Sequence, residues 1–481
     1  MALGEVDYGL MGVVGGLTAF ISFLNGIMAS GVGRFYAISV GAAKKDPMTG
    51  LEKCREWFTT AVLIHTVLPI VLMAIGYPVG EWVVRHYLTI PPDRIAACLW
   101  VWRFTCILCF VGMASVPYYA MYGAKQEIAE LTIYSFVTTT LNVVVLYYMI
   151  HHPADWLSRF ALWSCLLGVA PSLIITWRSI LKYKECRFRP AYVKCWSRIK
   201  QMLTYSGWVA IGVFADLLKC QGVNVLINKV FGPRANAAMS IGNTVSSQCT
   251  TLSGSLTGAF WPAIMNAYGE GNFEGARIMA FRVSKIAVLL ICIFAIPLCL
   301  EIDGVLKLWL IRPPQYSSGI CIGMLAVIVL DRLTTGQMIL INARGKMAVY
   351  QLVTGGISLL ALPFACVAAL IYGNVYWVIG TLVVVMAFQS LSRIMFASRL
   401  VKMSVRYYWS KLFVPLMLTG ILSVMIGLVP RILYTPSLGR ILLTTIVTEL
   451  SLLPLSWLLV LDGCERQFIM ERIERILNRK H

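Results

Sequence analysis

Residues 57–80 read WFTTAVLIHTVLPIVLMAIGYPVG, a run of 24 residues without Asp, Glu, Lys or Arg. As an α-helix this run is about 36 Å long, enough to cross the ~30 Å hydrocarbon core of a bilayer. Twelve further apolar runs occur at about 10–42, 95–122, 131–150, 157–177, 207–228, 236–266, 286–302, 316–342, 348–372, 376–398, 412–430 and 441–461. The sequence therefore predicts an all-α polytopic membrane protein with about 13 transmembrane helices.

The composition of the whole chain leads to the same prediction. Of its 481 residues, 58% are hydrophobic and 13% are charged, and the mean hydropathy is +0.75. Soluble domains have about 25% charged residues, so the composition excludes an appended soluble catalytic domain. The net charge of +19 is not interpreted as nucleic-acid binding, because basic residues in a membrane protein mark its cytoplasmic loops. We predict no nucleic-acid partner, no cofactor, no metal site and no catalytic residue.

Lys and Arg residues are distributed unequally between the two sides of the predicted membrane. Of the 41, 28 lie in one set of alternate loops and the C-terminal tail, and 9 lie on the other side. The positive-inside rule then places the C-terminus in the cytoplasm and Met1 outside. Because no signal peptide or span precedes Met1 to carry it across, we expect that one upstream helix belongs to this protein, which makes 14 helices.

The longest and most basic loop lies near the middle of the chain, where residues 177–201 read WRSILKYKECRFRPAYVKCWSRIKQ. We interpret it as a topology anchor that meets anionic lipid, in preference to a specific ligand site. It separates the expected domains: an N-terminal helical lobe at 1–182 that lacks its first helix, a basic cytoplasmic linker at 183–205, a C-terminal helical lobe at 206–400, and two additional helices with a basic tail at 401–481.

An internal repeat is visible when the sequence is shifted by 228 positions. Five residues then coincide with identical ones: Gly4, Met11, Leu24, Gly26 and Gly41 fall on Gly232, Met239, Leu252, Gly254 and Gly269. The two copies are six predicted spans apart, so they share one orientation in the membrane. Parallel repeats of this kind form two pseudo-symmetric bundles in transporters that rock around a midplane site.

Several polar and charged residues interrupt the apolar spans. A cationic side chain at the bilayer centre costs about 2.5–3.5 kcal/mol even on lenient scales, so each such residue needs a partner, a route to the interface or an aqueous cavity. The sixth span is the most polar, since Asp216 and Lys219 lie one turn apart and Asn224 and Asn228 continue the same stripe. An Asp216–Lys219 pair that only neutralises itself is the alternative to a cavity wall.

The remaining candidates for the cavity lie in other spans. Arg34 lies about nine residues before the inner end of the first span, and snorkelling to the surface is the alternative for this side chain. For Arg103, Asp331 and Arg332, structural pairing and cavity lining are both open. A cavity with buried cations suits an anionic substrate such as a lipid phosphate. The candidate substrate-binding residues are Arg34, Lys219, Asp216, Asn224, Asn228, Asn25, Arg103, Asp331 and Arg332.

Two segments resemble a known family. LGEVDYGLMGVVGGLTAFISFLNGIMASGVGRF at 3–35 and NVLINKVFGPRANAAMSIGNTVSSQ at 224–248 resemble the polysaccharide transporter family, the O-antigen flippases of the multidrug/oligosaccharidyl-lipid/polysaccharide exporter superfamily. The resemblance covers roughly Leu3 to Lys411. It implies two six-helix lobes around a central cavity, with two extra C-terminal helices.

The resemblance also implies a function. The family moves undecaprenyl-pyrophosphate-linked saccharide across the bacterial inner membrane by alternating access, for lipopolysaccharide and other surface polysaccharides. The expected partners are lipid-linked oligosaccharide, membrane lipids and other proteins of polysaccharide assembly. In related lipid-linked precursor flippases, cavity arginines hold the pyrophosphate, and Arg34 lies on the corresponding second helix. The chain departs from the family in the helix expected ahead of its start.

Two other classes of protein compete with this interpretation. A multidrug exporter of the same superfamily is the nearest, and the embedded cations argue against it because its preferred substrates are cations. A membrane-embedded acyltransferase or glycan polymerase is less favoured. In the HHPAD motif Asp155 is four positions after His151, which is one residue short of the H-x4-D spacing. No phosphate-binding loop surrounds Gly345 and Lys346. We therefore predict a transporter rather than an enzyme, with its driving force open.

Overall fold

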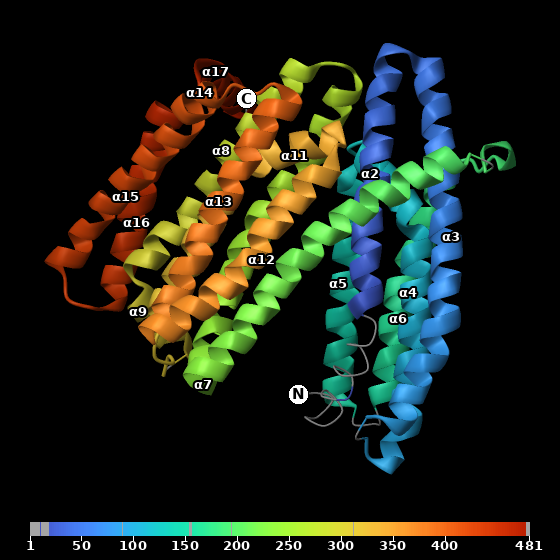
Figure 1. Ribbon diagram of the computed structural model, residues 1–481, viewed down its shortest axis with the longest axis horizontal. Helices are drawn as coiled ribbons and strands as arrows, with labels where there is room; N and C mark the ends of the chain where they lie inside the picture. Colours follow the sequence, from blue (N-terminus) through green and yellow to red (C-terminus); the bar gives the residue numbers. More distant parts are fainter. Residues whose placement is uncertain are drawn as a thin grey trace. The chain divides into compact units, whose positions relative to one another are not determined.

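The computed structural model describes Leu10 and residues 19–88, 90–152, 156–193, 195–310 and 312–477, which are almost entirely helical (Figure 1). The first half of the chain contains α2 (Ala19–Lys45), α3 (Pro47–His86), η1 (Pro92–Arg94), α4 (Ile95–Ala124), α5 (Ile128–His151), α6 (Trp156–Lys182), η2 (Pro190–Tyr192) and α7 (Trp196–Gly269). The second half contains α8 (Phe273–Leu300), α9 (Ile302–Leu310), α10 (Ser317–Arg332), α11 (Thr335–Arg344), α12 (Met347–Tyr372), α13 (Val375–Val401), α14 (Val405–Tyr408), η3 (Trp409–Phe413), α15 (Val414–Leu433), α16 (Leu438–Leu455), η4 (Ser456–Val460) and α17 (Gly463–Leu477).

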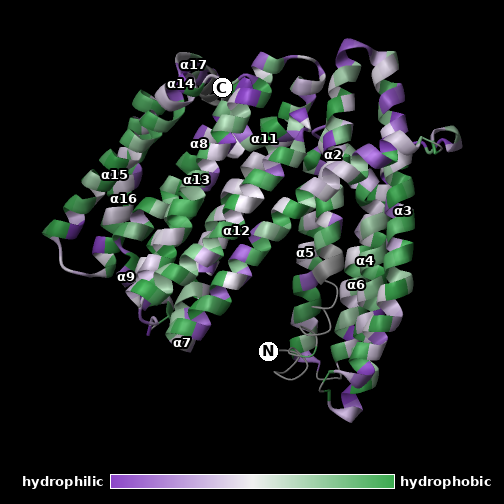
Figure 2. Ribbon diagram, in the orientation of Figure 1, coloured by the Kyte–Doolittle hydropathy of each residue, from purple (hydrophilic) through white to green (hydrophobic). Residues whose placement is uncertain are grey.

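The helices match the predicted apolar runs. Every run contains described helical residues, and Figure 2 shows hydrophobic residues along the middle of the helices and hydrophilic ones gathered near their ends. Within the described residues, ten helices are long and apolar enough to cross a membrane, or eleven if the bent pair α10 and α11 is one span. That count treats α7, from Trp196 to Ser255, as one candidate span. The prediction of an all-α polytopic membrane protein is therefore confirmed.

Local sequence signals fix where several of these helices begin and end. Asp46 caps α3, because its carboxylate accepts a hydrogen bond from the backbone N–H of Thr49 and Pro47 occupies the first turn. Ser437 caps α16 in the same way through the N–H of Arg440 at 3.2 Å. Gly373 ends α12 in the left-handed region at φ 58°, a conformation that glycine adopts at little cost.

The chain divides into two compact units. Unit 1 comprises Met1–Ala210 and Met265–Phe273, and unit 2 comprises Ile211–Ile264 and Glu274–His481. In unit 1, α2, α3 and α4 pack against one another and α6 packs along α4 (Figure 1). In unit 2, α13 packs against α10, α11 and α12. The helix α7 contributes to both units, since its first and last residues belong to unit 1 and its middle to unit 2.

A break at Gly232 divides α7 into two arms, which correspond to two of the predicted spans. Gly232 has a φ of 81°, which only glycine adopts without strain. Across this break, the side-chain amide of Asn243 donates to the side-chain oxygen of Asn224 at 3.4 Å. The two arms therefore fold back on each other as a helical hairpin.

The internal repeat has a reciprocal contact in unit 1. A Cβ atom on Gly41 of α2 would collide with the backbone carbonyl of Asn266 of α7, and one on Gly269 of α7 would collide with the backbone carbonyl of Ile38 of α2. The shift of 228 that relates the copies maps Ile38 onto Asn266 and Gly41 onto Gly269. Equivalent residues of the two copies thus meet each other in both directions, as in an isologous interface.

The basic loops of unit 1 gather at one end of the bundle. Lys125, after α4, lies 2.6 Å from Glu185 in the loop after α6, and Lys44 at the end of α2 lies 2.6 Å from Glu270. The hydroxyl of Tyr192 donates to Glu52 at 2.9 Å, and this hydrogen bond raises the pKa of Tyr192. The loops that the charge count places on the cytoplasmic side therefore contact one another.

The topology prediction is checked by cysteine labelling in a cysteine-free background. Single cysteines in place of Ala191 and Ser410, which are exposed and lie in predicted inner loops, should be shielded from an impermeant thiol reagent in intact cells. A cysteine in place of exposed Asn374 is the matched outer position and should react. Labelling of the Ala191 variant from outside is incompatible with the predicted orientation.

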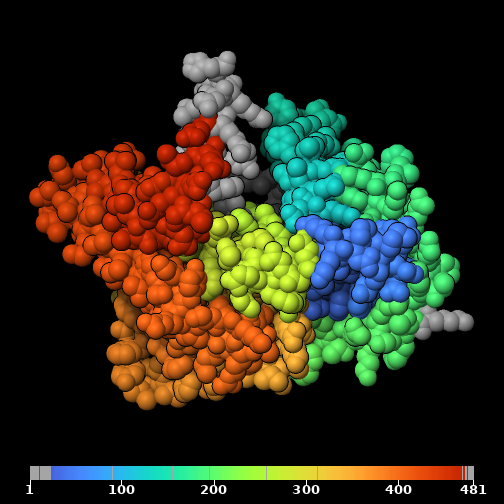
Figure 3. All heavy atoms as spheres, turned by 90° about the horizontal axis from the view of Figure 1, so that it is seen from above, coloured from blue at the N-terminus to red at the C-terminus, as the bar shows by residue number. Residues whose placement is uncertain are grey.

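Within unit 2, the last helices of the chain are joined to α8 and the residues after it by ion pairs at both ends. The guanidinium of Arg440 lies 2.7 Å from buried Glu301, which also accepts a hydrogen bond from Thr444 at 3.0 Å. At the other end, Lys285 of α8 lies 2.9 Å from Asp462 and 3.0 Å from Glu465. In Figure 3 the C-terminal segment accordingly lies beside α8.

Candidate functional site

Unit 2 has a polar network inside its apolar helices. The ammonium of Lys219 lies 2.9 Å from the carboxylate of Asp216 and donates to the hydroxyl of Ser358 on α12 at 3.2 Å. The hydroxyl of Ser358 in turn donates to Asp216 and contacts the amide of Gln389 on α13 at 3.4 Å. Three helices thus share one charged pair, and the Asp216–Lys219 pair of the sequence analysis is present.

A second ion pair lies between α10 and α13. The guanidinium of Arg393 contacts the carboxylate of Asp331 at 2.7 Å and the hydroxyl of Thr334 at 3.2 Å. Arg332 lies on the other side of Asp331, with its Nε 3.8 Å from the carboxylate. Arg393 and Thr334 are buried, so this carboxylate is held by cations in a low-dielectric surrounding, where an unpaired charge is very costly.

The two pairs differ in how far they reach the surface of unit 2. The side chain of Asp216 is 49% exposed, whereas that of Arg393 is 8% exposed. Ser358 and Gln389, which bind Lys219 and each other, are buried. Asp216 is therefore the most exposed of the four charged side chains, and Arg393 is the most buried, with Asp331 at 28% exposure between them.

The other candidates on α7 are less connected. Asn224 accepts a hydrogen bond from Asn243 across the hairpin, whereas Asn228 is exposed and makes no side-chain hydrogen bond within the described residues. On the second arm, the hydroxyl of Ser246 is buried without a hydrogen-bond partner in the part of the chain that the structure describes. Within the described residues, the second arm therefore has a buried hydroxyl at Ser246 that is available to a further hydrogen-bond partner.

In unit 1, Arg34 is buried among aromatic rings. Its guanidinium lies 4.9 Å from the ring centroid of Phe35 and 4.9 Å from that of Tyr205 on α7, distances at which a cation is attracted to the π face. Gly31, one turn before Arg34, lets Ser206 approach α2, because a Cβ on Gly31 would collide with the hydroxyl of Ser206. The Arg34 side chain is therefore enclosed by protein, with 9% of it exposed.

Two further candidates lie elsewhere in unit 1. Asn25, two and a half turns before Arg34 on α2, has a buried side-chain oxygen without a partner among the described residues. Arg103 lies over the ring of Trp100 at 5.1 Å and 3.7 Å from Glu81, which also binds Arg85. Arg103 therefore belongs to an ion-pair cluster of α3 and α4.

Four participants in the unit 2 contacts are not among the sequence candidates: Thr334, Ser358, Gln389 and Arg393. Ser358 and Gln389 are single polar residues in apolar runs and gave no signal. Arg393 lies inside the predicted span 376–398, and the charge count includes it among the 28 basic residues of the inner side. The structure corrects this assignment: Arg393 is a buried residue of α13 whose charge is matched by Asp331.

Comparison with known proteins identifies the fold. No family model matches the chain, and no curated protein matches it. Among solved structures it resembles the outward-facing conformation of a multidrug resistance MATE family transporter of the MOP superfamily, with a TM-score of 0.67 and 12% identity over 83% of this chain and 89% of the other. It also resembles a MOP superfamily transporter from Pyrococcus furiosus, with a TM-score of 0.65 and 14% identity over 84% of this chain and 92% of the other.

A third similar structure is a mutant of the Vibrio cholerae MATE transporter VcmN, with a TM-score of 0.65 and 16% identity over 84% of this chain and 93% of the other. Identities in this range show a shared fold and leave the substrate open. The resemblance to the superfamily is therefore supported at the level of the fold, and the narrower resemblance to polysaccharide transporters stays a prediction. The protein has the fold of the MATE transporters of the MOP superfamily.

Proposed function

We propose that this protein is a membrane exporter that moves an amphipathic organic molecule across the bilayer by alternating access. The observation that carries the proposal is the buried polar network of unit 2, built from four helices of a MOP-type fold. Ionisable residues inside membrane helices are costly and usually mark a transport pathway. Here Asp216, the most exposed of the four charged side chains, is the group that a substrate can reach.

The favoured substrate class is that of a multidrug exporter. Lys219 does not act as an isolated cation, because Asp216 neutralises it at 2.9 Å, and Arg393 is likewise neutralised by Asp331 at 2.7 Å. The expectation of an anionic substrate depends on embedded cations that face a cavity. With the unit 2 cations paired, and with Asp216 rather than Lys219 more exposed, an amphipathic cation suits this unit at least as well.

A flippase of pyrophosphate-linked saccharide is the second candidate, and Arg34 favours it. Its guanidinium lies between aromatic rings, which hold the cation in an apolar setting where a phosphate contact is strong. Export of lipid-linked saccharide for surface polysaccharide, with bacterial inner-membrane localisation, follows if the substrate is an anion. The two candidates share the fold and the alternating-access mechanism and differ in the charge of the substrate.

One experiment separates the two candidates. A host that lacks its own exporters of each kind is complemented with the full chain, and both the efflux of a lipophilic cationic dye and the surface display of glycan are measured. The multidrug proposal expects dye efflux at least about fivefold above the empty host and no restored glycan. Restored glycan without dye efflux would reverse the preference, and failure of both would remove the exporter proposal.

Arg34 variants test the saccharide candidate at a single side chain. If Arg34 binds phosphate, Arg34→Ala should reduce glycan export at least about tenfold, because a charged hydrogen bond contributes about 1.5–3 kcal/mol, and Arg34→Lys should restore only part of it. Protein level in the membrane, measured by immunoblot, must stay at the wild-type value. The matched control is Arg103→Ala, which removes an arginine that pairs with Glu81 and should leave export unchanged.

A further inference from the structure

The helix α5 is unusual in unit 1 because it hardly packs against its neighbours. Of its described residues, only Met149 is buried. Its outward face is strongly apolar, with Ile133 62% and Phe136 72% exposed. Its other face carries polar residues at helical spacing: Tyr134, Ser135, Thr138, Thr139 and Asn142. Within the described residues, α5 therefore has an apolar outer face and a second face whose hydroxyls lie toward α4 and α6.

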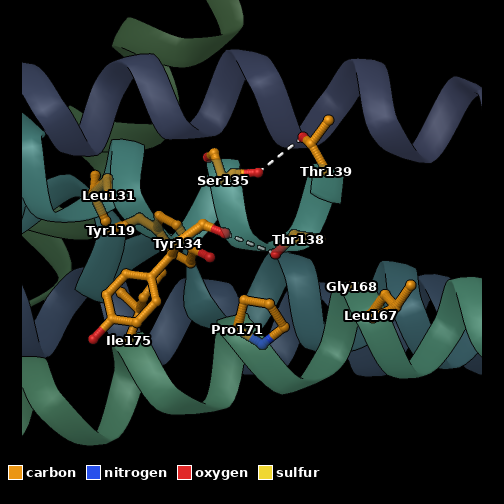
Figure 4. A pocket seen from close by; sticks show the side chains of 10 residues that line it. All are labelled: Tyr119, Leu131, Tyr134, Ser135, Thr138, Thr139, Leu167, Gly168, Pro171 and Ile175. Carbon is orange, nitrogen blue, oxygen red and sulfur yellow. Dashed lines mark hydrogen bonds between the residues drawn. The ribbon is translucent and has the colours of Figure 1, made fainter. Parts of the chain in front are cut away.

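A cavity of about 290 Å³ lies on this inner face, between α5, α4 and α6. Figure 4 shows Ser135, Thr138 and Thr139 on the α5 side and Leu167, Pro171 and Ile175 on the α6 side. The lining of the cavity contains hydroxyls and apolar groups and no charged residue. It therefore suits an uncharged group that accepts hydrogen bonds and continues into hydrocarbon.

The polar atoms of the lining are not all occupied. The hydroxyls of Thr138 and Thr139 donate to the backbone oxygens of Tyr134 and Ser135 at 2.9 and 2.8 Å. Within the described residues, Tyr134 and Ser135 take part in these hydrogen bonds only through their backbone oxygens, and the Tyr134 hydroxyl interacts electrostatically with Arg178. Pro171 has no N–H, so the Leu167 carbonyl in the same wall lacks its usual helical donor. In a membrane these groups need a partner other than water.

The depth of the cavity indicates which group could fill it. Glu130 on α5 and Arg178 on α6 form an ion pair at the end of this helix pair, and Lys182 lies 2.9 Å from Glu130. This end is also where Lys125 and the basic loop meet. Tyr134 follows Glu130 by one turn, and Thr138 follows by two, so the cavity begins about 6 Å and extends about 12 Å from the charged layer. We take the charged layer of Arg178 and Lys182 as the level of the lipid phosphates. The ester groups of a phospholipid, which lie just inside its phosphate, are then level with the cavity.

We propose that this cavity binds one diacyl phospholipid of the predicted cytoplasmic leaflet through its glycerol-ester region. The ester carbonyls accept hydrogen bonds from the hydroxyls of Tyr134 and Ser135. Glu130 engages Arg178 through Nε, and the half-exposed guanidinium of Arg178 is the donor that we assign to the phosphate. One acyl chain continues along the apolar outer part of α5. The lipid is then a bound component that fastens α5 to α4 and α6.

The test uses the full chain, purified in mild detergent and analysed by native mass spectrometry and by mass spectrometry of the extracted lipid. We expect one retained diacyl phospholipid per chain, and at least tenfold weaker rebinding of phosphatidylglycerol or phosphatidylethanolamine by Ser135→Trp, whose indole fills the cavity. Thr140→Val is the matched control, because Thr140 carries a hydroxyl on α5 that does not line the cavity, and this variant should bind lipid like the wild type.

A second variant keeps the proposal testable if Ser135→Trp does not fold. The double variant Tyr134→Phe with Ser135→Ala removes these two hydroxyl donors without added bulk and should weaken rebinding several-fold. Binding equal to the wild type by either folded variant overturns the proposal. A retained sugar or lipid-linked saccharide in place of a phospholipid overturns it as well. Export is measured in parallel, and its loss or retention bears on the proposed function independently.

Discussion

Adding a single methyl group at Gly41 or Gly269 should destabilise the protein, although the same change in most helices stabilises. In a helix interior, Ala is normally favoured over Gly by about 0.5–1 kcal/mol. A Cβ at either position, however, would collide with a backbone carbonyl of the facing helix, which cannot move aside like a flexible side chain. We expect Gly41→Ala and Gly269→Ala each to lower the free energy of unfolding by about 1–3 kcal/mol.

The repeat supplies the matched controls. Gly26 and Gly254 are also related by the shift of 228, lie on α2 and α7, and have open space where a Cβ would be placed. Gly26→Ala and Gly254→Ala should therefore leave stability unchanged or raise it. Thermal unfolding of the detergent-solubilised chain measures all four variants. If the two pairs behave alike, the reciprocal crossing of α2 and α7 is not a close contact.

The combination of both substitutions sharpens this prediction. Gly41 and Gly269 contact opposite partners across one crossing, so the first methyl group already separates the helices that the second would push apart. The double variant should then cost less than the sum of the single variants, which is the signature of a shared contact in a double-mutant cycle. Strict additivity would mean that the two contacts are independent.

The helices of this protein could be predicted from the sequence because each span is a local property. A run such as 57–80 is apolar and long enough by itself, and the caps at Asp46 and Ser437 involve residues three positions apart. The repeat could be detected for the same reason, since its signal lies in identities such as Gly41 with Gly269. The repeat alone does not predict that Gly41 of the first copy and Gly269 of the second each contact the other copy, because this contact depends on how α2 and α7 cross.

The candidate site was predictable only in part, for a physical reason. Charges inside spans identified Asp216, Lys219 and Asp331, because such residues are rare and costly in hydrocarbon. Their partners are distant in sequence: Ser358 binds Asp216 across 142 positions and Arg393 binds Asp331 across 62. The Asp216–Lys219 pair itself is local, three residues apart, so the sequence offers it as an alternative, but the contact of both side chains with Ser358 cannot be predicted from it. The hydroxyls of α5 gave no signal, since Ser and Thr are common in membrane helices.

The largest single loss of stability is expected when one partner of the Asp331–Arg393 pair is removed. Their 2.7 Å contact lies between α10 and α13, and Arg393 is buried. Arg393→Met leaves the Asp331 carboxylate with Arg332 at 3.8 Å as its remaining cation. Breaking a buried pair in this way costs about 3–5 kcal/mol, so we expect the folded protein recovered after detergent extraction to fall severalfold.

Removing both charges should restore much of the stability that the single substitution Arg393→Met loses. In the double variant Asp331→Leu with Arg393→Met neither charge is left uncompensated, and apolar replacements of buried pairs are often neutral in stability. The same comparison at Asp216 and Lys219 should give a smaller cost, because the side chain of Asp216 is 49% exposed. Thermal unfolding of the four single variants and two double variants measures both pairs. If Arg393→Met is as stable as the wild type, the pair does not hold α10 to α13. If the double variant regains stability but no longer exports, the two charges serve transport rather than folding.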